Sequence, residues 1–161
     1  MADKIKKVLD KLLLTISAIL LIVLVLGALW QVFSRYILNS PSTFTGELLG
    51  FLLVWVSLLG ASYAFGSKEH LALTFLIGKL EGKSKLMTTV VIDVFIIIFA
   101  VLVLIKGGLD AVNTTMSQLT PVLGIKMGLV YSILPISGCI ILIYKLLDFT
   151  QYKVQSEEVG D

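Results

Sequence analysis

The sequence predicts an all-α integral membrane protein with four transmembrane helices. Its 161 residues are 57% hydrophobic and only 15% charged, and its mean hydropathy is +0.99. A soluble domain of this size would expose too much apolar surface, so a lipid bilayer is the expected solvent. Four apolar windows are each close to the ~20 residues that a helix needs to cross a ~30 Å hydrocarbon core. Helices are expected because lipid offers backbone groups no other hydrogen-bond partners.

We expect a single membrane domain over residues 1–161, with spans at about residues 12–34, 48–67, 86–105 and 127–145. The first window follows a basic segment, as in a signal peptide, but it is too long and no small-residue cleavage site follows. We therefore expect it to be retained. Pro135 lies inside the fourth window and removes the hydrogen bond to the Tyr131 carbonyl, which predicts a kink.

The basic residues predict the orientation of the spans. Ten of the 13 Lys and Arg residues lie in the N-terminal segment, the connection after the second span and the C-terminal segment. Arg35, Lys106 and Lys126 lie in the other two connections. Loops rich in Lys and Arg remain in the cytoplasm, so we expect both termini to be cytoplasmic.

The connection after the second span predicts a further, amphipathic helix over about residues 67–80. Its apolar residues follow one helix face, at Leu73, Leu76, Ile77 and Leu80. The segment is too short and too charged at its ends to span, so we expect it to lie in the membrane interface against lipid or a partner. His70 would lie at the bend after the second span, where hydrogen bonding or capping is its expected role.

The chain offers little for catalysis or cofactor binding. With one histidine and one cysteine it cannot form a His/Cys metal cluster or a bis-histidine haem site within one chain. It has no glycine-rich phosphate loop and no basic cluster beyond the membrane flanks, so nucleic acid is not an expected partner. We expect no enzymatic activity, no catalytic residue, no cofactor and no metal site.

Asp93 is the one ionisable residue well inside an apolar window. An acid at the centre of a membrane helix costs about 2.5–3.5 kcal/mol on insertion scales, so its side chain should face protein. We expect no Lys or Arg at its depth and expect hydrogen bonds from serines of the second and fourth spans, at Ser57, Ser62 and Ser137. One hypothesis is a structural acid at a helix contact; the other is a proton or ion relay.

Other residues suggest helix contacts. Arg35 and Glu47 flank the first connection, where they either mark the water boundary or form an ion pair, and Thr45 could cap the second helix. Small residues at Gly46/Gly50, Gly60/Ala64 and Gly124/Gly128 permit close packing. The indole N–H of Trp55, near the middle of the second span, needs a partner. Membrane-interface anchoring is expected of the aromatic residues Trp30, Tyr36 and Tyr144.

Two stretches resemble the signature of one transporter family. The first matches it at Arg35, Pro41, Glu47, Trp55, Gly60, Ala61, Ala64 and His70, and the second at Leu123, Gly124, Ile125, Tyr131, Pro135 and Gly138. Over nearly its whole length the chain is similar to DctQ-like small membrane subunits of tripartite ATP-independent periplasmic (TRAP) transporters. It departs from the usual pattern at Phe44, Gly46, Gly50 and Lys126, which weakens the case for a charged network around Glu47 but not for the fold.

The resemblance implies a scaffold subunit in the bacterial inner membrane. In this family the small subunit packs against a large permease, which moves substrate and sodium by an elevator motion. A periplasmic binding protein delivers the substrate, an organic acid. Likeness to members that serve sialic acid uptake makes sialic acid the first candidate and C4-dicarboxylates the second. Candidate contact surfaces are Trp55 and the Gly60–Ala64 ridge.

Two other functions fit the sequence. The chain could be a small proton-coupled four-helix carrier that uses Asp93, or a membrane anchor or assembly subunit of an unrelated complex. A self-sufficient carrier of four helices would normally have an acid in its first span, and residues 12–33 contain none. This favours the accessory role.

Overall fold

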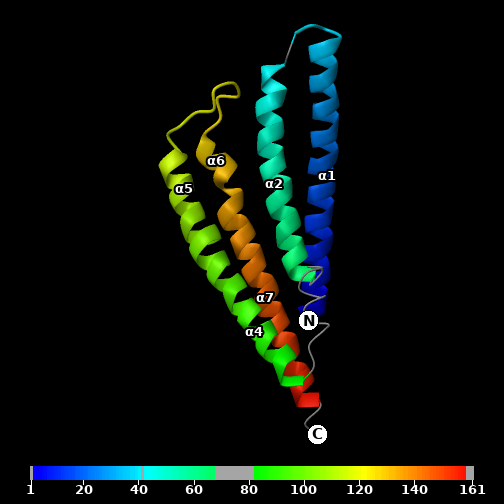
Figure 1. Ribbon diagram of the computed structural model, residues 1–161, viewed down its shortest axis with the longest axis vertical. Helices are drawn as coiled ribbons and strands as arrows, with labels where there is room; N and C mark the ends of the chain where they lie inside the picture. The colour runs from blue at the N-terminus through cyan, green and yellow to red at the C-terminus, as the bar shows by residue number, and fades with distance from the viewer. Residues whose placement is uncertain (1, 41, 68–81, 159–161) are drawn as a thin grey trace.

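The computed structural model describes residues 2–40, 42–67 and 82–158, whose regular elements are helices. In chain order they are α1 (Ala2–Tyr36), α2 (Thr43–Ser67), α4 (Gly82–Phe99), the π-helical segment η1 (Ala100–Gly107), α5 (Gly108–Thr115), α6 (Met127–Tyr131) and α7 (Ile133–Glu158). Helices α1 and α2 form one hairpin. The continuous rod of α4, η1 and α5 packs beside α6 and α7 as the other (Figure 1).

The two hairpins lie side by side and are not parallel along their full length. Both chain termini lie at one end of the bundle, which we call the terminal end, and the connections after α1 and α5 lie at the other, the loop end (Figure 1). The hairpins approach each other toward the terminal end and diverge toward the loop end (Figure 1). Helix α7 contacts α1, α2, α4 and η1, so it is the central helix of the bundle.

Four described helices are long and apolar enough to cross a membrane, which confirms the expected all-helical fold. They are Lys4–Tyr36, Thr43–Ser67, Met87–Thr115 and Met127–Asp148. The third is longer than expected, because we ended it where Lys106 closes the apolar window. A single Lys does not stop a helix, and no proline occurs between Lys106 and Pro121, so the rod continues. The expected interfacial helix, with His70, Leu76 and Leu80, lies outside the described residues except for Ser67.

Local sequence explains the helix ends at the loop end. Helix α2 begins at Thr43, earlier than the expected start at residue 48, and its cap is Ser42 rather than Thr45. The Ser42 Oγ accepts the Thr45 N–H at 3.4 Å, and the Thr45 hydroxyl donates back to the Ser42 carbonyl at 2.9 Å. The fourth span is interrupted at Ser132, between α6 and α7 and one turn before Pro135, as the proline predicts.

Two close approaches bring α7 against its neighbours. A Cβ built on Gly66 of α2 would lie inside contact distance of the Tyr144 ring, and one on Gly138 would lie 2.9 Å from the Leu104 Cβ of η1. The buried apolar residues around these contacts form two groups, one with Leu13, Leu59, Ile133 and Tyr144 and one with Ala100, Leu104 and Ile141. The absence of a side chain on the two glycines therefore sets how closely α2 and η1 approach α7.

Replacing these glycines should destabilise the bundle. We expect Gly66→Leu and Gly138→Leu each to lower the free energy of unfolding by about 1–3 kcal/mol, the usual cost of overpacking a filled core. Gly60→Leu is the matched control on α2, because no heavy atom lies within 4 Å of a Cβ built there. Thermal unfolding of the purified full chain in detergent measures the difference. Equal midpoints for Gly60→Leu and Gly66→Leu would contradict this packing.

Candidate functional site

The acid inside the third span is paired with a lysine of the fourth. Lys145 Nζ donates to Asp93 Oδ1 at 2.6 Å, and the two side chains are only 8% and 16% exposed. The expectation that no Lys or Arg lies at the depth of Asp93 is therefore wrong. We had placed Lys145 at the water boundary, but α7 continues beyond it to Glu158, so the lysine lies on a packed helix surface.

Two of the serines expected to donate to Asp93, Ser62 and Ser137, have other partners, and the third, Ser57, is exposed. Ser62 donates to the Leu58 carbonyl at 2.8 Å and, at 3.5 Å, to the Ser137 carbonyl of α7. The Ser137 hydroxyl donates to the Leu134 carbonyl of its own helix at 2.8 Å. Both serines are fully buried where α2 meets α7, so they contribute to helix packing and not to the environment of Asp93.

Two further polar contacts join α1 to α7 near the same end. The Tyr144 hydroxyl donates to Asp10 Oδ1 at 2.5 Å, and Lys6 Nζ lies 3.5 Å from Asp148 Oδ1. The pairs share one register, because four residues separate the two partners on each helix and the helices are antiparallel. Tyr144 is 1% exposed, so the expectation that it anchors at the membrane interface is wrong.

These contacts form one group, which we call the terminal-end cluster. It consists of Lys6 and Asp10 of α1, Asp93 of α4, and Tyr144, Lys145 and Asp148 of α7. The three α7 residues lie within about 100° of one another around the helix axis. Among the described residues no group of His, Cys, Asp and Glu could hold a metal ion. The chemistry of the cluster is that of ion pairs and hydrogen bonds between helices.

At the loop end a carboxylate holds the second hairpin. Glu47 Oε2 of α2 accepts the backbone N–H of Leu123 at 2.7 Å and that of Val122 at 3.1 Å. The connection that carries these N–H groups is folded back on itself, because the backbone N–H of Thr120 donates to the Ile125 carbonyl at 2.9 Å. Arg35 is exposed and forms no ion pair with Glu47. The carboxylate therefore joins the two hairpins instead of fixing the first one.

Trp55 has the partner that its indole N–H needs. Nε1 donates to the Val130 carbonyl at 3.0 Å, in the last turn of α6 before the interruption at Ser132. An apolar groove of about 220 Å³ lies beside this contact, between α2 and α6, and is lined by Leu48, Phe51, Leu52, Trp55, Ile125, Leu129 and Val130. The Trp55 side chain therefore connects α2 of the first hairpin to α6 of the second.

The structure separates the other expected site residues. Gly60 lies in open space and Ala64 is half-buried, so that ridge remains accessible on α2. Pro135 packs near Gly108, where a Cβ would lie 2.8 Å from the proline Cδ. Sequence reasoning missed the contacts of Lys6, Asp10, Tyr144, Lys145 and Asp148. A usable signal was present, because Lys6 with Asp10 and Tyr144 with Asp148 are both spaced four residues apart and match in an antiparallel pairing.

Comparison with known proteins identifies the family. A family model described as the DctQ component of tripartite ATP-independent periplasmic transporters matches residues 24–151. A TRAP transporter small permease protein of Haemophilus influenzae is 29% identical over 141 residues, which cover 88% of this chain and 84% of that protein. The sialic acid TRAP transporter small permease protein SiaQ of Vibrio cholerae is 25% identical over 146 residues, or 88% and 83%.

A third relative is a longer protein. The sialic acid TRAP transporter permease protein SiaT of Haemophilus influenzae is 26% identical over 106 residues, which are 66% of this chain but only 17% of SiaT. The DctQ match covers most of the chain, including the second, third and fourth membrane-length helices in full and the last 13 residues of the first. The protein therefore belongs to the DctQ family: it is the small permease subunit of a TRAP transporter, a multi-pass membrane protein of a family that is not enzymatic.

Proposed function

We propose that this subunit is a rigid scaffold for a large permease during uptake of an organic acid. The observation that carries the proposal is the Asp93–Lys145 pair, which commits the acid inside the third span to a contact within the chain. The groove beside Trp55 is lined by apolar side chains and offers no polar site for an organic acid. Transporter substrate sites commonly lie near the bilayer midplane and need polar groups there.

The partner is supported by the comparisons. TRAP transporters consist of a DctQ component, a large permease and a periplasmic binding component. A segment similar to this chain forms 17% of the longer permease protein SiaT. A chain of this kind is therefore expected to work in contact with a large permease, with the Gly60–Ala64 ridge of α2 as a candidate contact surface.

The proposal also includes a substrate and a driving force. Two of the relatives are named for sialic acid, which makes sialic acid the first candidate and other organic acids the next. We propose a sodium gradient as the driving force and a periplasmic binding protein as the source of substrate. We also propose that the terminal end is cytoplasmic, because ten of the 13 basic residues lie in segments on that side.

Labelling of single cysteines tests the orientation. In a Cys139-free background, cysteines at Ser42 and Gln118 should react with an impermeant thiol reagent in intact cells, because both lie at the loop end. A cysteine at Ser84, in the first turn of α4, should react only after the membrane is opened. Labelling of Ser84 in intact cells with protection of the other two positions would reverse the proposed orientation.

Reconstitution tests the dependence on a partner. The chain alone in liposomes should move no organic acid under a sodium gradient, whereas liposomes with the chain, its large permease and a loaded binding protein should do so. Gly60→Leu should reduce co-purification with the permease several-fold while leaving the stability of the isolated chain unchanged, because the site is open in this structure. Uptake by the isolated chain would refute the scaffold proposal.

Substitution of the buried ion pair separates a scaffold from a carrier that uses Asp93. Lys145→Met or Asp93→Leu alone should destabilise the chain by about 3–5 kcal/mol, because each leaves one buried charge unpaired. The double variant should recover most of the stability and should support sodium-driven uptake in the complex. Removal of the exposed residues, Lys106→Met with Asp110→Leu, is the charge-matched control. A stable, assembled double variant without uptake would favour the relay.

A further inference from the structure

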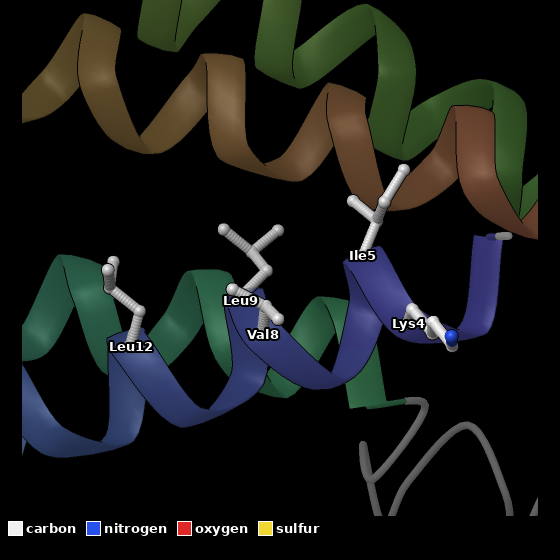
Figure 2. A pocket seen from close by; sticks show the side chains of 5 residues that line it. All are labelled: Lys4, Ile5, Val8, Leu9 and Leu12. Carbon is white, nitrogen blue, oxygen red and sulfur yellow. The ribbon is translucent and has the colours of Figure 1, made fainter.

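The first turns of α1 place an apolar hollow beside a row of lysines. The hollow has a volume of about 340 Å³ and is lined by Lys4, Ile5, Val8, Leu9 and Leu12. In Figure 2 the Ile5 and Leu9 side chains extend from α1 toward the neighbouring ribbon of α7. Val8 is 67% exposed and Leu12 51% exposed, so the described residues leave these apolar side chains uncovered.

Lys4 lines the hollow, and Lys7 and Lys11 lie on the flank of α1 beside Lys4. A helix turns by about 100° for each residue, so Lys4, Lys7 and Lys11 lie within about 60° of one another around α1. Val8 lies next to Lys4 on the other side of it. All three lysines are exposed. Lys6 lies on a different face, where it contacts Asp148. The row therefore presents three cations that the terminal-end cluster does not use.

The described acidic side chains of the terminal end all have partners within the bundle. Asp10 accepts from Tyr144, Asp93 pairs with Lys145, and Asp148 pairs with Lys6. The face thus combines exposed apolar groups with a local excess of positive charge. This is the complement of a lipid that has both an acyl chain and an anionic headgroup.

The depth of the segment agrees with such a ligand. The candidate span Lys4–Tyr36 has 33 residues, a rise of about 50 Å at ~1.5 Å per residue, which exceeds the ~30 Å hydrocarbon core. Its charge-free part begins at Leu12, so the turns that carry the lysines lie at headgroup depth. An acyl chain beside Val8 and Leu12 would then point into the hydrocarbon, with its phosphate near the lysines.

We propose that this face binds an anionic phospholipid of the leaflet at the terminal end. The acyl chain would occupy the hollow between Ile5 and Leu12, and the phosphate would bind Lys4, Lys7 and Lys11. The leaflet is the cytoplasmic one if the orientation in the proposed function holds, although binding itself does not depend on that orientation.

Native mass spectrometry of the purified, delipidated complex of the full chain with its permease tests the proposal. The probes are phosphatidylglycerol and phosphatidylethanolamine with identical acyl chains, and glycerol phosphate as the headgroup alone. We expect phosphatidylglycerol to bind at least tenfold more tightly than phosphatidylethanolamine, and glycerol phosphate not to bind. Replacement of Lys4, Lys7 and Lys11 by Gln should weaken phosphatidylglycerol binding by about fivefold for each lysine. The control Lys106→Gln with Lys126→Gln should leave it unchanged.

Two measurements separate a built site from diffuse attraction. Val8→Trp fills the hollow and retains the lysines, so it should abolish the preference for phosphatidylglycerol over phosphatidylethanolamine. A photoactivatable phosphatidylglycerol should cross-link to residues 4–12 of the unaltered chain. Equal binding of the two lipids, or unchanged binding in Val8→Trp, would overturn the proposal. Cross-linking of the lipid probe to the permease and not to residues 4–12 would also overturn it. Uptake and co-purification are measured separately, so failure here leaves the scaffold proposal standing.

Discussion

The bundle depends on one electrostatic constraint: the carboxylate inside the third span needs a partner on the packed helix surface where it lies. Asp93 on α4 has that partner in Lys145 of α7, which approaches to 2.6 Å. Removing one member of such a pair leaves a buried charge, so the pair fixes where the rod of α4, η1 and α5 lies against α7. The neighbouring residue Tyr144 binds Asp10 in the same way, which ties α1 to the same helix. Helix α7 thereby carries the terminal-end polar contacts of both hairpins.

The two ends of the bundle are joined by different chemistry. At the terminal end, side chains pair with side chains across buried helix surfaces. At the loop end, the hairpins diverge and Glu47 spans the gap by accepting two backbone N–H groups of the second hairpin. Between these ends, Trp55 donates to the Val130 carbonyl. Polar contacts at three heights along the bundle oppose relative rotation of the hairpins, which is the property that the proposed scaffold function requires.

The sequence was sufficient for the spans and insufficient for their contacts. Apolar windows predicted four helices, and Pro135 predicted the interruption of the fourth, because both follow from local chemistry. The partner of Asp93 depended on the relative depth of two distant helices, and we placed Lys145 at the boundary because its apolar window ended there. Tyr144 was misassigned for a related reason: tyrosines near span ends usually face the interface, and only the packing against Gly66 shows that this one does not.

The surfaces left open follow from the contacts that are made. Helix α2 packs Gly66 against Tyr144 and Ser62 against α7. Around Gly60, one helix turn before Ala64, no described atom lies close to a Cβ built on the glycine. Helix α2 thus packs against the bundle at some positions and leaves others open on its surface. A subunit whose polar groups hold its own helices together has few left to read a substrate. On the proposed function, discrimination among organic acids therefore belongs to the permease and the binding protein, and this chain contributes position.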